Sequence, residues 1–121
     1  MSQKKRYHIH ISLVRNENVN LENALEYALS TDYFLTWDLL ATHTNFVEYS
    51  RQQIDQCDYM IFILGNDYGH LRLSGVSYLH LSYIYASSKR VPMIALVNTQ
   101  PSQHELLRQR LDLFNLVIKE Q

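Results

Sequence analysis

The sequence predicts an α/β domain of the flavodoxin-like class, with an open parallel sheet of four or five strands and helices on both faces. Short β-rich runs alternate with segments of helical length, which is the pattern of right-handed βαβ units. The run Asp58–Gly65 (DYMIFILG) is almost wholly apolar, as expected for a strand covered on both faces of a parallel sheet. The chain has only 3 glycines and 2 prolines, which argues against an all-β fold rich in tight turns.

The first half of the chain supplies two strand–helix pairs. Tyr7–Val14 (YHIHISLV) alternates with the period of a strand. We expect Asn20 to cap the helix that follows. The buried face of that helix is predicted to hold Leu21, Ala24, Leu25, Ala28 and Leu29. Tyr33–Leu40 is the second predicted strand and Phe46–Cys57 the second helix, with Phe46, Val47, Ser50 and Ile54 facing inward.

The second half continues the alternation. After the strand Asp58–Gly65 we expect a loop over Asn66–Gly75, a helix within Ser74–Ala86 and a fourth strand, Val91–Val97. The pattern from Ser102 to Glu105 is a capping box for a fourth helix. Two alternatives stay open for the segment NLVIKE at 115–120, a short fifth strand or the end of that helix.

Composition limits the function classes. The 121 residues suit one domain, residues 1–121, with enough chain for a real core. A formal net charge of -1 gives no indication of nucleic acid or of an anionic membrane as a partner. Cys57 is the single cysteine, so no intramolecular disulfide and no Cys-based zinc site can form. No apolar run approaches the roughly 20 residues that span a bilayer, and we expect a soluble, cytoplasmic domain.

A ligand of an open parallel sheet lies at the carboxyl ends of the strands, near the topological switch point. The candidate cleft residues by this rule are Ser12, Asp38, Gly65, Asn66, Asp67, Tyr68, Gly69, Ser77, Tyr78 and His80. No GxGxxG, P-loop, HExxH or GxSxG motif occurs, so we predict no resident cofactor and no metal. The six histidines are expected to pack under helices, and Asp38 with Asp67 is a possible pair of catalytic carboxylates.

The segment Arg51–Val97 resembles the bacterial domain of unknown function 4062, a relative of TIR domains and nucleoside deoxyribosyltransferases. The resemblance lies in an I-x-x-C-D-Y lead into an apolar strand, a G-x-x-Y-G loop, a G-x-S-Y turn, a helix with Y-x-Y-A and the proline before the next strand. The matching residues are Ile54, Cys57, Asp58, Tyr59, Gly65, Tyr68, Gly69, Gly75, Ser77, Tyr78, Tyr83, Ala86 and Pro92. The N-terminal third fits more loosely, since only Ser12 remains of a serine-threonine loop.

The resemblance implies acidic residues in the helix after Ser77 and Tyr78, where related folds carry a glutamate that acts on an N-glycosidic bond. This chain has His80 and Ser82 at those positions, and no Asp or Glu occurs between Asp67 and Glu105. An imidazole that is partly cationic is poorly suited to stabilising an oxocarbenium-like transition state. The helix therefore indicates a catalytically degenerate domain.

Three functions follow as hypotheses. The first is a non-catalytic, TIR-like interaction domain that self-associates or recruits a protein partner, and whose family members usually stand at the N-terminus of longer proteins. Its nine tyrosines fit an interface. The second is a hydrolase or transferase that cleaves NAD or a nucleoside, with Asp38, Asp67 or His80 as the catalytic group. The third is a domain that binds NAD or another nucleotide in the same cleft without turnover.

Overall fold

The sheet has four parallel strands, and its order reverses near the centre. The computed structural model describes residues 6–98 and 107–120. The strands are β1 (His8–Ser12), β2 (Phe34–Trp37), β3 (Tyr59–Leu64) and β4 (Met93–Val97), in the order β2-β1-β3-β4. The predicted flavodoxin-like open sheet is confirmed, and its topological switch point lies between β1 and β3.

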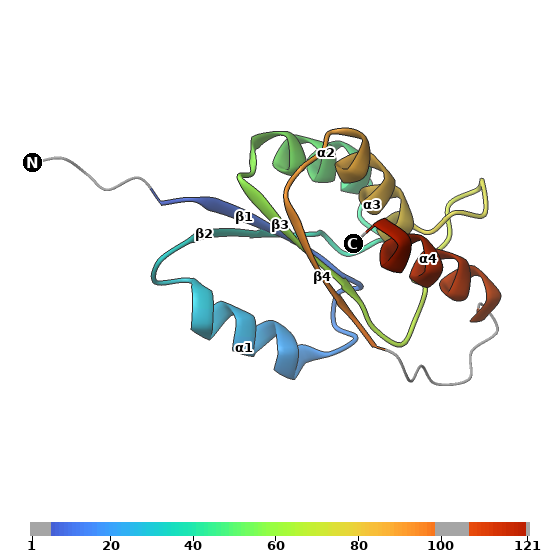
Figure 1. Cartoon of the computed structure of the whole chain (residues 1–121), viewed down its shortest axis with the longest axis horizontal. Coiled ribbons are helices and arrows are strands. Elements are labelled where there is room, and N and C mark those ends of the chain that lie inside the picture. The colour runs from blue at the N-terminus through green and yellow to red at the C-terminus, as the bar shows by residue number, and fades with distance from the viewer. Residues whose placement is uncertain (1–5, 99–106, 121) are drawn as a thin grey trace, which may run out of the picture.

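Four helices cover the sheet unevenly. They are α1 (Val19–Leu29), α2 (Phe46–Gln56), α3 (Tyr78–Ser88) and α4 (Leu107–Glu120). Figure 1 shows α1 by itself on one side of the sheet, with α2, α3 and α4 on the other. We call the first side the α1 face and the second the three-helix face.

Each face has its own apolar core. On the three-helix face, Met60, Phe62 and Leu64 of β3 pack against α2, α3 and α4. On the α1 face, strands β1 and β3 pack against α1 and β2 through a second cluster. Its buried members are Ile9, Ile11, Leu13, Ile61 and Ile63, and its half-buried members include Leu21, Leu25, Leu29 and Leu35. Side chains of β3 alternate between the two cores, which explains why its sequence is apolar throughout.

The first helix, α1, differs from its prediction in its cap and in its buried face. The predicted cap of α1 is wrong, because Asn18 and not Asn20 accepts a hydrogen bond, 3.1 Å from the backbone N–H of Leu21. Ala24 and Ala28 are exposed, so the apolar stripe of α1 is narrower than predicted and consists of its half-buried leucines.

The helices of the second half also differ from their predicted bounds. The helix predicted over Ser74–Ala86 begins at Tyr78, with Ser77 as its cap, and ends at Ser88. Residues 115–120 continue α4, so of the two alternatives the helix is the one found. The capping box over 102–105 lies outside the described residues.

Strand β4 forms an edge of the described sheet and is only half covered. Met93, Ala95 and Val97 pack against the core of the three-helix face. Ile94 and Leu96 point to the α1 face, where the apolar cluster includes no residue of β4. They remain 64% and 41% exposed. One side of β4 is therefore apolar and uncovered by the described helices.

Within residues 6–98 and 107–120, none of the helices has both the length and the apolar character that crossing a membrane requires.

Candidate functional site

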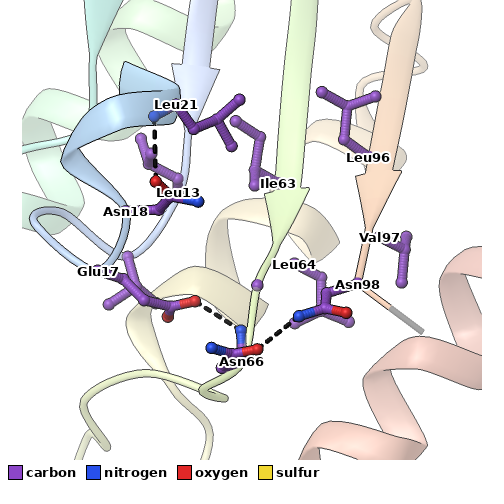
Figure 2. Close-up of a pocket in the computed structure, with 12 residues that line it drawn as sticks. Leu13, Glu17, Asn18, Leu21, Ile63, Leu64, Asn66, Leu96, Val97 and Asn98 are labelled. Atoms are coloured by element: carbon purple, nitrogen blue, oxygen red, sulfur yellow. Dashed lines mark hydrogen bonds between the residues drawn. The ribbon is translucent and has the colours of Figure 1, made fainter. Parts of the chain in front are cut away.

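A pocket of about 360 Å³ opens at the carboxyl ends of β1, β3 and β4, on the α1 face. This is the position that the switch-point rule gives for a ligand. Figure 2 shows an apolar floor under a polar rim. The floor consists of Leu13, Val14, Leu21, Ile63, Leu64, Leu96 and Val97, and the rim of Glu17, Asn18, Gly65, Asn66 and Asn98.

Glu17 joins the loop after β1 to the loop after β3. Its carboxylate accepts hydrogen bonds from the backbone N–H groups of Asn66, at 2.5 Å, and of Asp67, at 3.3 Å. Burial raises the pKa of the Glu17 carboxyl, while the two N–H donors act in the opposite direction. A Cβ atom on Gly65 would collide with Glu17 Oε1, so glycine allows this close approach.

The other rim groups are also paired. The Asn98 side-chain amide donates to Asn66 Oδ1 at 2.5 Å, as Figure 2 shows, and Asn18 Oδ1 caps α1. Rim groups that already hydrogen-bond to one another form a closed edge. A ligand here would have to displace some of these bonds.

Arg110 of α4 hydrogen-bonds to the backbone at the carboxyl ends of β3 and β4. It is buried, and it donates to the carbonyl of Gly65 at 2.9 and 2.7 Å and to that of Asn98 at 2.5 Å. Burial lowers the pKa of Arg110, and the nearby Glu17 and Asp67 carboxylates oppose that shift. Its donors are directed at the strand ends rather than into the pocket. Among the described residues, the pocket lining contains no Lys or Arg, so this lining is poorly matched to a polyphosphate.

The predicted cleft residues Ser12 and Asp38 are fully buried under α2 rather than in this pocket. Ser12 Oγ donates to Asp38 Oδ2 at 2.6 Å, and His10 Nε2 donates to Asp38 Oδ1 at 2.8 Å. Thr36 Oγ1 lies 2.8 Å from His10 Nδ1 and 2.7 Å from His8 Nε2.

Three more of the predicted residues hydrogen-bond to one another at the start of α3. Ser77 Oγ accepts from the backbone N–H of His80 at 3.0 Å. The Tyr68 hydroxyl accepts from the backbone N–H of Ser77 at 3.2 Å and donates to His80 Nδ1 at 2.6 Å. Burial lowers the pKa of His80, which agrees with a neutral ring that accepts this bond.

The remaining predicted residues divide between the two faces. Gly65 and Asn66 are on the rim of the pocket, and Asp67 follows them. Gly69 and Tyr78 line a smaller cavity of about 90 Å³ on the other side of β1. The structure therefore does not bring the ten residues into one cleft. The described residues contain no cluster of three or more His, Cys, Asp and Glu that could hold a metal ion.

Glu17 and Asn98 line the pocket but are not among the ten named candidates. Both lie in segments where the switch-point rule predicts a site from the sequence, Ser12–Asn18 after the first strand and Val97–Gln100 after the fourth. The sequence signal that could have identified Glu17 was an acidic residue in the loop after the first strand, next to the topological switch point. Cys57 offers no alternative chemistry, since burial raises the pKa of its thiol to about 11.

Comparison with known proteins identifies the family. The family model described as Domain of unknown function (DUF4062) matches residues 13–118. No curated protein matches the chain. A match of this extent covers the loops and helices described above, and the chain belongs to the DUF4062 family.

Proposed function

We propose that this domain is a non-catalytic association module that binds protein through the open side of β4. The observation that carries the proposal is the exposure of Ile94 and Leu96, 64% and 41%, on one face of β4. Contiguous exposed apolar side chains beside a sheet edge are typical of interaction surfaces. Tyr59, 44% exposed, lies on the same face of the neighbouring strand, so the apolar surface spans β3 and β4.

The arrangement of acidic groups supports a non-catalytic role. Asp38 is buried between His10 and Ser12, where it cannot reach a ligand in the pocket. Helix α3 contains no Asp or Glu. Among the described residues of the pocket lining, Glu17 is the acidic one, and its carboxylate is held by backbone N–H groups. The TIR-like relationship inferred from the sequence fits the same role, since TIR-like domains commonly associate with one another.

Sedimentation of the pure protein over a wide concentration range tests the proposal. We expect a concentration-dependent increase in mass for the wild type. The Ile94→Lys variant should weaken association about tenfold or more, because a lysine in an apolar contact must be desolvated. Leu73→Lys is the matched control, since Leu73 is fully exposed on a loop away from β4. A wild type that stays monomeric at every concentration would contradict self-association.

The pocket favours a second candidate, the binding of a small neutral ligand without turnover. Its size of about 360 Å³ and its amide rim suit a nucleoside-sized molecule. A thermal-shift screen with nucleosides and with NAD tests this, since a ligand of the native state raises the unfolding temperature. Release of free base in the same samples, lost in Glu17→Gln or Asp67→Asn, would instead indicate an enzyme.

A further inference from the structure

The outer edge of β4 carries hydrogen-bonding groups that β3 does not use. The backbone N–H of Asn98 donates to Leu64, and the backbone N–H of Met60 donates to the carbonyl of Pro92. Because successive residues of a strand point their backbone groups to opposite sides, Ile94 and Leu96 also bond toward β3. Met93, Ala95 and Val97 therefore direct theirs outward. In the described part of the chain, β4 pairs with β3 and with no other strand.

The residues of β4 itself lack the side chains that commonly protect a sheet edge from pairing. Met93–Val97 (MIALV) has no charge, no proline and no glycine, whereas sheet edges are commonly guarded by lysine, proline or a bulge. An uncharged apolar edge strand is a template for another strand.

Helix α4 adds apolar side chains on the other side of the same edge. Glu120 accepts hydrogen bonds from Tyr83 and Ser87 of α3, which fixes the side of α4 that faces α3. Leu111 and Ile118 lie roughly on the opposite side by helical spacing, and they are 50% and 56% exposed. The open edge of β4 therefore has exposed apolar side chains on both faces of the sheet. These are Ile94 and Leu96 on the α1 face, and Leu111 and Ile118 of α4 on the three-helix face.

We propose that two copies of this chain associate by pairing their β4 strands antiparallel about a two-fold axis through Ala95. The proposal rests on the association function above and names its partner and its surface. Antiparallel pairing puts Ile94 opposite Leu96 of the second copy and Met93 opposite Val97, so every cross-strand pair is apolar. The same surface serves both copies, as a two-fold interface requires.

Helix α4 fits the same axis. Its Arg110 lies at the carboxyl end of β4, by the carbonyl of Asn98, and its Glu120 lies by Ser87, near the amino end. The helix therefore runs antiparallel to β4, with its middle near Ala95. The axis consequently places Leu111 of one helix beside Ile118 of the other, and the two helices pack on the three-helix side of a continuous sheet.

Charge complementarity favours the second copy as the occupant. Lys89, Arg90 and Lys119 are exposed at the amino end of β4, where the acidic Glu120 also lies. Glu17 and Asp67 lie at the carboxyl ends of the neighbouring strands, close to the buried Arg110. Of these groups, the amino end carries the excess of basic side chains and the carboxyl end the excess of acidic ones. A two-fold axis brings the amino end of one strand beside the carboxyl end of the other, so basic groups of one copy approach acidic groups of the other. Pairing in the parallel direction would bring like charges together instead.

Cross-linking in one defined register tests the geometry. Because Ala95 bonds outward, Ile94 and Leu96 of the second copy form a non-hydrogen-bonded pair, with Cα atoms about 4.5 Å apart, which suits a disulfide. In a Cys57→Ser background, a mixture of Ile94→Cys and Leu96→Cys proteins is oxidised. We expect a disulfide dimer in the mixture at about tenfold or higher yield than in either variant alone, since each alone pairs its cysteine with an apolar side chain.

The matched control mixes Ile94→Cys with Leu73→Cys, whose exposed cysteine meets Ile94 only by random collision. If sedimentation detects association but the Ile94–Leu96 mixture cross-links no better than this control, the two-fold β4 pairing is wrong and the association function stands. If the wild type is monomeric throughout, both fail. Leu111→Lys should weaken association as Ile94→Lys does, and an unchanged mass in that variant would remove α4 from the interface.

Discussion

At the residue scale, Asp38 is the clearest case of a carboxylate whose role is decided by its neighbours. In the sequence it is an acid at a strand end, and in the fold it bridges His10 and Ser12 in the fully buried space under α2. A buried carboxyl group that is hydrogen-bonded is a structural element, because its removal leaves its polar partners unsatisfied. Asp38 therefore acts on the stability of the domain.

Replacing Asp38 tests this role directly. Asp38→Ala removes the acceptor for both His10 Nε2 and Ser12 Oγ, and we expect the free energy of unfolding to fall by about 3 kcal/mol. The control Asp32→Ala changes an exposed acid and should alter stability by about 0.5 kcal/mol or less. Urea unfolding measures both. Equal stability of the two variants would contradict the buried network.

Two histidines make stability depend on pH. Burial is the largest cause that lowers the pKa of His8 and of His80 below the ordinary value. An unfolded histidine titrates near pH 6.5, so between the folded pKa and about 6.5 the unfolded chain binds more protons than the folded one. Stability is then complete above about pH 6.5 and decreases as the pH falls.

Chemical unfolding at about pH 7.5 and about pH 5.5 measures this effect. The wild type should be less stable at the lower pH, and His80→Gln should lose part of that difference. His43→Gln changes an exposed ring and should keep the wild-type dependence. A wild type that is equally stable or more stable at the lower pH would refute the assignment of buried neutral rings.

At the element scale, the loops after β1 and β3 are joined through Glu17 and Gly65. The two residues lie far apart in sequence, and they meet because β1 and β3 are neighbours in the sheet. Sequence patterns identified the strands themselves, above all β3 with its unbroken apolar run. They could not identify the Glu17 contact or the Asp38 bridge, since both depend on strand order and register rather than on local spacing.

A double-mutant cycle tests the Glu17–Gly65 contact. Gly65→Ala should displace the Glu17 carboxylate from the Asn66 and Asp67 N–H groups and cost about 1–2 kcal/mol of stability. In a Glu17→Ala background, the methyl group that Gly65→Ala adds no longer collides with the Glu17 carboxylate. The loss of unfolding free energy caused by Gly65→Ala should therefore largely disappear. Additive effects of the two substitutions, measured by urea unfolding, would show that the residues do not interact.

At the scale of the whole molecule, the central feature is a parallel sheet covered by three helices on one face and by α1 on the other (Figure 1). Fold class, strand succession and helix succession followed from the alternation of β-rich and helical segments. The open side of β4 did not, because Ile94 and Leu96 have the composition of a buried strand, and only the packing of α1 leaves them exposed. The predicted ligand cleft likewise divided between two faces of the sheet.

Residue-resolved amide hydrogen exchange in β4 tests the two-fold association most directly. The amides of Ile94 and Leu96 bond toward β3, and those of Met93, Ala95 and Val97 point outward. The account predicts alternating protection in dilute solution, and protection of all five amides at concentrations where sedimentation finds the dimer. Fast exchange at Met93, Ala95 and Val97 in the associated protein would contradict it.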